Sequence, residues 1–222
     1  MYVRIKNCIS TYCNYTMSEL GVILRKQQNK LIESLKKKSH FGTEQIESLL
    51  NLYRKCSDGT DKMDRNQFRE FLHHVFQMTD DIILDRIYKY FDMDNDGIIG
   101  REEWVLGLSV FLKGTPQEHI RYCFHIYDLN GDDCITKEEM LTMLKTSLGR
   151  QIIDEDPDEG VKDLIEMTLR KLDVDKDGRV SFSDWQESVE ADSLMLEAFG
   201  PCLPSRRSGE DFLHKLENNA FL

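Results

Sequence analysis

The stretch FDMDNDGIIGREEW, from Phe91 to Trp104, holds five carboxylates and two glycines in fourteen residues. Carboxylates a few Å apart repel one another unless a cation neutralises them. Counted from Asp92, side-chain oxygens fall at positions 1, 3, 5 and 12, and Gly97 at position 6 can take the positive φ of a sharp turn. This spacing wraps hard oxygen ligands around a calcium ion between two helices. The stretch therefore predicts a helix-loop-helix calcium site.

The same spacing recurs in DLNGDDCITKEE, from Asp128, and in DVDKDGRVSFSD, from Asp173. Three joint matches of ligands, turn residue and an apolar position 8 identify EF-hand loops rather than solvated acidic turns. Position 7 contributes its backbone carbonyl, and Thr136 and Ser181 stand at position 9, where a water often mediates the contact. The predicted calcium ligands are Asp92, Asp94, Asp96, Ile98, Glu103, Asp128, Asn130, Asp132, Cys134, Glu139, Asp173, Asp175, Asp177, Arg179 and Asp184.

Two of the loops depart from the pattern. Asp133 replaces the turn glycine of the second loop, and aspartate enters the left-handed region at some cost, so we expect that loop to be weakened but still to bind. Asp184 replaces glutamate at position 12 of the third loop. Its shorter side chain reaches the ion less easily in bidentate fashion, which favours weaker calcium binding or competition by magnesium.

EF-hands usually occur in pairs, so a partner is expected 36 residues before Asp92, the interval from Asp92 to Asp128. The stretch CSDGTDKMDRNQ, from Cys56 to Gln67, has an apolar Met63 at position 8 but Cys56 at position 1 and Gln67 at position 12. It predicts an EF-hand in shape that does not bind calcium.

The flanking segments show apolar residues at helical spacing, so the predicted fold is all-α, of the EF-hand superfamily, with four helix-loop-helix units in two lobes plus terminal helices. The predicted divisions are a basic extension (1–42), an N-lobe (43–114, with units 43–77 and 79–112), a C-lobe (115–200, with units 115–148 and 158–190) and a tail (201–222). Thr43, Thr79 and Thr115 are candidate helix caps.

The net charge of the N-terminal extension is opposite in sign to that of the rest of the chain. The net charge is −11, yet residues 1–42 carry eight Lys or Arg against two Glu, a net +6, which leaves −17 on residues 43–222. Such an acidic body argues against nucleic-acid binding. Residues 18–39 predict an amphipathic helix with Leu20, Ile23, Leu24, Leu31, Ile32 and Leu35 on one side; we expect it to contact protein rather than membrane.

Two features of the apolar residues leave alternatives open. Met78, Met140, Met143, Met167 and Met195 either fill the core or line an adaptable groove for a partner. The tail carries Phe212, Leu213 and Leu216 at helical spacing, and we hypothesise that it covers such a groove at low calcium.

Six scattered cysteines without zinc spacing, and an N-terminus without the apolar run of a signal peptide, predict a cytoplasmic protein with reduced thiols.

The loops, with MTDDIILDRIYKYFDMDNDG, YCFHIYDLNGDDCITKEEM, DEDPDEGVKDLIEMTL and LMLEAFGPCLP, resemble the calaxins over roughly residues 39–204. The calaxins lie within the neuronal calcium sensor and calcineurin-B branch of EF-hand proteins. The resemblance implies a calcium sensor in the axoneme of the cilium or flagellum, whose partner is the outer-arm dynein heavy chain or another axonemal component associated with microtubules. Nothing in the resemblance covers residues 1–24.

Three binding functions remain open, namely a sensor, a calcium buffer and a calcineurin-B-like regulatory subunit of an enzyme. A sensor opens and exposes apolar surface on binding calcium, whereas a buffer barely opens. An enzyme is disfavoured because the sequence contains no HExxH, GxSxG or phosphate-loop motif.

Overall fold

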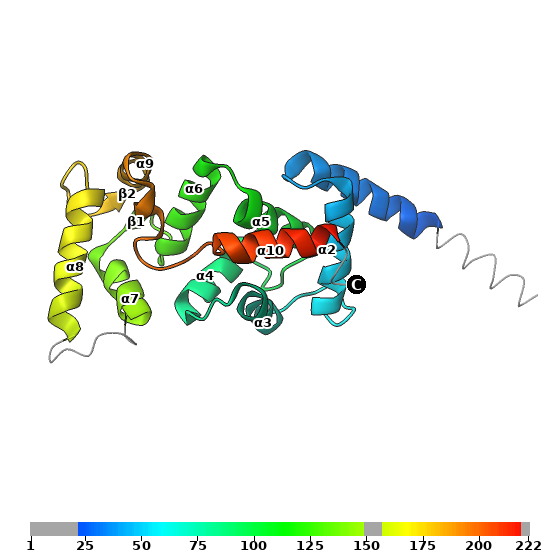
Figure 1. Cartoon of the computed structure of the whole chain (residues 1–222), viewed down its shortest axis with the longest axis horizontal. Helices are drawn as coiled ribbons and strands as arrows, with labels where there is room; N and C mark the ends of the chain where they lie inside the picture. Colours follow the sequence, from blue (N-terminus) through cyan, green and yellow to red (C-terminus); the bar gives the residue numbers. More distant parts are fainter. Residues whose placement is uncertain (1–21, 149–156, 219–222) are drawn as a thin grey trace, which may run out of the picture.

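The computed structural model describes residues 22–148 and 157–218, which form an elongated array of helices (Figure 1). A helix over residues 22–38 precedes the elements α2 (Thr43–Cys56), α3 (Arg65–Phe76), α4 (Asp81–Phe91), α5 (Arg101–Lys113), α6 (Pro116–Tyr127), β1 (Cys134–Ile135), α7 (Lys137–Leu148), α8 (Pro157–Leu172), β2 (Val180–Ser181), α9 (Phe182–Ala191), the 3₁₀ helix η1 (Ser193–Glu197) and α10 (Arg206–Glu217).

The helices follow one another as four helix-loop-helix units, which confirms the predicted all-α class. The short strands β1 and β2 pair antiparallel, with Ile135 opposite Val180. In the first half of the chain Met63 and Ile99 form the equivalent bridge, with N–O distances of 3.0 and 3.3 Å. All four are position-8 residues, so each loop is joined to its neighbour at the same point, and the loop from Cys56 to Gln67 has the shape of an EF-hand.

The structure confirms one of the three N-cap residues predicted from the sequence. Thr115 caps α6 in a reciprocal box with Glu118: the Glu118 amide donates to the Thr115 hydroxyl over 3.3 Å, and the Thr115 amide donates to the Glu118 carboxylate over 2.7 Å. The other two predictions are wrong by one residue. Gly42 precedes α2, and Asp80 caps α4 by accepting from the amides of Ile82 and Ile83. Asp80 prevails over Thr79 because its carboxylate reaches two amides at the positive end of the helix.

The core is rich in aromatic side chains, with Trp104 among Phe68, Phe71 and Tyr53 in one lobe and Trp185 beside Tyr127 and Phe199 in the other. The five methionines named from the sequence differ in how deeply they are buried. Met78, Met140 and Met143 are buried and Met195 packs partly against the core, whereas Met167 is 63% exposed.

The terminal helices pack on the first lobe differently. In the helix over residues 22–38, Ile32 and Leu35 are buried, but Ile23 and Leu24 are more than half exposed, so only its second half packs as predicted. Leu20 lies outside the described residues. The chain ends by returning from the second lobe to the first, where α10 lies across α2 and α3 (Figure 1).

Candidate metal centres and the elements that hold them

The loop after α4 gathers its three aspartates around one point. Ligand oxygens of Asp92, Asp94 and Asp96 lie within 4.8 Å of one another. The Asp92 carboxylate, which is buried, accepts hydrogen bonds of 3.0 Å from the amides of Asp96 and Gly97. Gly97 has φ +80°, the turn predicted for position 6. Three converging carboxylates, one of them buried, fit the donor set that a hard divalent cation requires.

Glu103 reaches across this loop from the first turn of α5. One carboxylate oxygen accepts from the Gly100 amide over 2.7 Å, and the other accepts from the Met93 amide over 2.9 Å and the Asp94 amide over 3.3 Å. Its two oxygens therefore join both ends of the loop. This reach is what a bidentate ligand at position 12 needs.

The loop after α6 has the same arrangement despite its missing glycine. Asp133 takes φ +63°, and its amide donates to Asp128 over 3.0 Å, as the amide of Gly97 does to Asp92. Glu139 accepts from the amides of Asn130, over 3.0 Å, and Thr136, over 2.8 Å. The Asn130 side chain donates to Asp132 over 3.1 Å, so one amide replaces a repelling carboxylate.

The loop after α8 is acidic but held less tightly at position 12. Asp173, Asp175 and Asp177 converge as in the first loop. Among the described contacts, the Asp184 carboxylate accepts only from the Ser181 amide, over 3.0 Å, and hydroxyl, over 2.5 Å. Glu103 accepts from the amides at positions 2 and 3 of its loop and Glu139 accepts from the amide at position 3, whereas no such bond is described for Asp184. The missing methylene accounts for the difference.

Repulsion among these carboxylates affects the pKa of Asp175. A hydrogen bond from the Asp177 amide lowers this pKa, but lost hydration and the charges of Asp177, Asp184 and Asp173 outweigh the bond, so the pKa is raised above its ordinary value. A bound cation would relieve this repulsion.

The three position-7 residues lie between the acidic turn and the bridge to the next loop, where a calcium ion needs a carbonyl. The amides of Ile98, Cys134 and Arg179 each donate to the aspartate at position 5, over 2.8, 3.1 and 2.8 Å. The loops thus bring the predicted ligand residues together, and the role of each as a calcium ligand stays a prediction.

In the loop after α2, amide and hydroxyl side chains make the closing hydrogen bonds, and neither position 1 (Cys56) nor position 12 (Gln67) is a carboxylate. The Gln67 side chain donates to Asp58 over 3.2 Å, and the hydroxyls of Ser57 and Thr60 donate to each other's carbonyls over 2.6 and 2.7 Å. Asp61 pairs with Arg101 on the outside. The side chains of Ser57, Thr60 and Gln67 are therefore hydrogen-bonded within the loop, and the expectation that this loop does not bind calcium stays a prediction.

Replacing Asp184 with the longer glutamate should strengthen calcium binding by the third loop. Asp184→Glu is expected to raise calcium affinity there by roughly tenfold or more, because one charge-assisted contact contributes about 1.5–3 kcal/mol. Calorimetry in a Glu103→Gln, Glu139→Gln background would isolate this loop. Unchanged affinity would show that side-chain length at position 12 does not limit binding.

Sequence reasoning missed Arg86, which joins the two lobes. This α4 residue is 9% exposed, and its guanidinium donates to the carbonyls of His125, over 2.6 Å, Ile126, over 3.2 Å, Asp128 and Leu129. It thereby caps the C-terminal end of α6 and holds the first residue of the next calcium loop. The only signal was a cation within the apolar run of α4.

Burial lowers the pKa of Arg86 below the ordinary range for a guanidinium, and the charges of Asp128 and Glu139 partly offset that effect. The pKa of Arg86 therefore depends on the charge of the loop that its guanidinium contacts. A cation bound there would reduce the favourable field on Arg86, so calcium and the interlobe contact are electrostatically linked.

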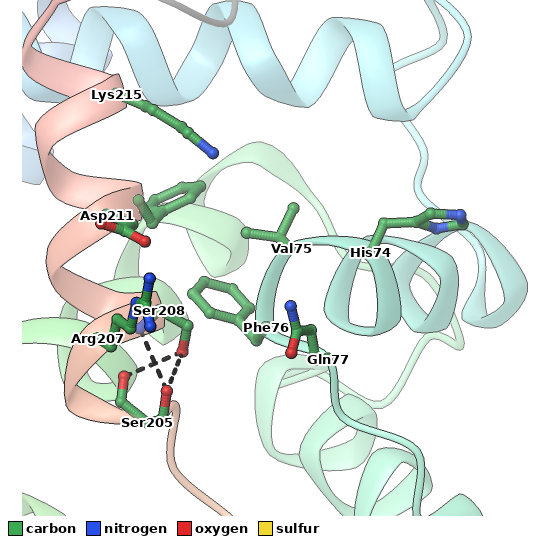
Figure 2. Close-up of a pocket in the computed structure, with 10 residues that line it drawn as sticks. His74, Val75, Phe76, Gln77, Ser205, Arg207, Ser208, Asp211 and Lys215 are labelled. Atoms are coloured by element: carbon green, nitrogen blue, oxygen red, sulfur yellow. Dashed lines mark hydrogen bonds between the residues drawn. The ribbon is translucent and has the colours of Figure 1, made fainter.

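Helix α10 covers apolar side chains of the first lobe. Phe212 and Leu216 are each 1% exposed, and the Phe212 ring lies 5.4 Å from that of Phe76 and 6.1 Å from that of Phe71, between centroids. A cavity of about 490 Å³ remains between the end of α3 and α10. Figure 2 shows the side chains that line it, among them Gln77 from the end of α3 and Lys215 from α10. The helix therefore packs on the first lobe through Phe212 and Leu216 beside an open cavity.

Comparison with known proteins agrees with this geometry. The EF-hand domain pair matches residues 117–189, and a single EF hand matches residues 89–108. Calaxin of Bos taurus is 51% identical over 196 residues, covering 85% of this chain and 92% of the bovine protein; calaxin of Homo sapiens is 48% identical over 195 residues, with the same coverage.

Calcineurin B of Candida glabrata is more distant, at 28% identity over 175 residues, which cover 76% of this chain and 95% of the Candida protein. Within the described residues, no helix combines the length and apolar character needed to cross a membrane. Two lobes of paired EF-hands and about half of all aligned residues shared with the calaxins lead to one conclusion: this chain belongs to the calaxin family of EF-hand calcium sensors.

Proposed function

We propose that this calcium sensor regulates axonemal outer-arm dynein, and hence the beating of cilia and flagella. The proposal places it in the cytoplasm at the axoneme, with the outer-arm dynein heavy chain as partner and no catalytic step of its own. Membership of the calaxin family supports the proposal. Calcium is the proposed ligand of the loops at Asp92, Asp128 and Asp173, with magnesium competing most strongly at the last.

The packing of α10 on the first lobe is the observation that carries the mechanism. Helix α10 packs on α2 and α3, and its buried Phe212 and Leu216 cover apolar side chains there; this covered surface is called the groove below. Calcium that favours a state without this contact would expose the groove to a target. Because the target binds only that state, target and calcium must raise each other's affinity by the same factor.

A titration with an apolar dye tests the sensor step. Fluorescence of dye with the full chain should rise sigmoidally with free calcium between roughly 10⁻⁷ and 10⁻⁵ M at constant magnesium, since sensors open in this range. A flat trace with calcium bound would indicate a buffer, or a subunit whose groove is already filled.

Removing α10 should imitate the calcium signal. Deletion of residues 205–222 is expected to raise dye fluorescence in the absence of calcium, because it uncovers the side chains around Phe71 and Phe76. Glu210→Gln, an exposed change on the same helix outside the cavity, provides the control. Equal dye binding by the deleted and full chains without calcium would show that α10 does not cover the groove.

Binding to purified outer-arm dynein tests the partner. Sedimentation with dynein should increase with calcium, and should fail to increase for Glu103→Gln, Glu139→Gln. The similarity to calcineurin B favours a second candidate, a constantly bound regulatory subunit of an enzyme. Calcium-independent co-purification with a target would support that candidate instead.

A further inference from the structure

Two buried cysteine thiols from distant parts of the chain touch in the second lobe. Cys123 lies on α6, and Cys202 lies in the segment between η1 and α10. Their sulfur atoms are 3.0 Å apart, and both residues are 0% exposed. A disulfide bond has a length of about 2.0 Å, so the two sulfurs need to approach by only about 1 Å to reach bonding distance.

Packing on both sides of the pair fixes this contact. The Tyr122 hydroxyl donates to the Cys202 carbonyl over 3.0 Å, and the Tyr127 hydroxyl donates to the Gly200 carbonyl over 2.6 Å. Phe199 is fully buried against Tyr127 and Trp185. The segment that carries Cys202 is therefore held on α6 by contacts that do not involve either sulfur.

We propose that Cys123 and Cys202 are a modification site that forms a reversible intramolecular disulfide under a peroxide oxidant. One thiol loses its proton and attacks a peroxide oxygen, which breaks the O–O bond, releases one water and leaves a sulfenic acid. The other sulfur then attacks the sulfenic sulfur and expels its hydroxyl as a second water. Two thiols are oxidised and one hydrogen peroxide is reduced to two waters.

Burial controls how fast this site reacts. The thiolate is the nucleophile, and burial raises the pKa of Cys123 well above its ordinary value, with the contact to Cys202 raising it further. Oxidation should therefore proceed through openings that expose the segment, and closing then returns the sulfurs to contact. The disulfide should form slowly but without rearrangement of the fold.

The cross-link would tie the segment before α10 to the second lobe. Cys202 and Cys123 are 79 positions apart, and three residues separate Cys202 from Arg206, the first residue of α10. A disulfide would hold the start of this connection on α6 while leaving α10 itself unlinked. The oxidised chain should resist thermal unfolding more than the reduced chain, because a closed loop of this length restricts the unfolded state.

Peptide mapping of the full wild-type chain tests the site without any substitution. Reduced protein is treated with hydrogen peroxide under native conditions, blocked at its remaining thiols and digested with trypsin. We expect a peptide pair joining residues 122–137 to residues 180–206, with fragmentation that assigns the link to Cys123 rather than Cys134. Dithiothreitol should separate the pair.

Thermal melts supply the second measurement. Peroxide should raise the Tm of the wild-type chain and of Cys56→Ser, a half-buried cysteine on α2, whereas Cys123→Ser and Cys202→Ser should show no rise. The proposal is overturned if folded wild-type protein yields no linked pair while Cys56 or Cys134 is oxidised, or if the pair appears only in denaturant. The wild-type peptide map decides the matter even if the serine variants fail to fold.

Discussion

Replacement of both Glu103 and Glu139 by glutamine is expected to abolish the calcium response in the sensor range. Each glutamate joins both ends of its loop through its two oxygens. Glutamine keeps the shape but replaces one oxygen with an NH₂ group and removes the charge. The loss of a charge-assisted contact costs about 1.5–3 kcal/mol, so each affinity should fall between roughly 10- and 100-fold.

Calorimetry would measure both affinities, and dye fluorescence would measure the opening. Glu102→Gln with Glu138→Gln is a matched control, because these neighbours undergo the same chemical change on exposed faces of the same helix turns. The control should respond to calcium as the wild type does. A Glu103→Gln, Glu139→Gln chain that still regulated its target normally would contradict the proposed mechanism.

Arg86→Met is expected to destabilise the calcium-free protein and loosen the contact between its lobes. Methionine retains the volume of the aliphatic stem but leaves four carbonyls without their charged donor. With hydrogen bonds to charged groups contributing about 1.5–3 kcal/mol each, a net loss of about 3 kcal/mol corresponds to a fall in Tm of roughly 6–12 °C.

Arg65→Met is the matched control for this change. The Arg65 guanidinium pairs with the Asp85 carboxylate between α3 and α4, but its side chain is 52% exposed. Exposed pairs contribute less than about 1 kcal/mol, so we expect a Tm change of no more than roughly 4 °C. Equal changes in the two variants would mean that Arg86 does not join the lobes.

Local spacing predicted the elements of this protein well. The all-α class, the EF-hand shape of the first loop and the left-handed turn at Asp133 follow from residues within one 12-residue loop or its flanking helices. The wrong caps at Thr43 and Thr79 are local errors, each displaced by one residue. The exposed Ile23 and Leu24 show that an amphipathic pattern does not fix how much of a helix is covered.

By itself, the sequence determined where carboxylates gather, because the ligands of an EF-hand loop are neighbours along the chain and their geometry is set by one turn. Only the tertiary structure decided what holds the loops and lobes together. Arg86 meets Asp128 across 42 positions, Cys123 meets Cys202 across 79, and α10 returns to Phe71 and Phe76 from the far end of the chain. Such contacts depend on how whole helices pack, and no short-range spacing encodes them.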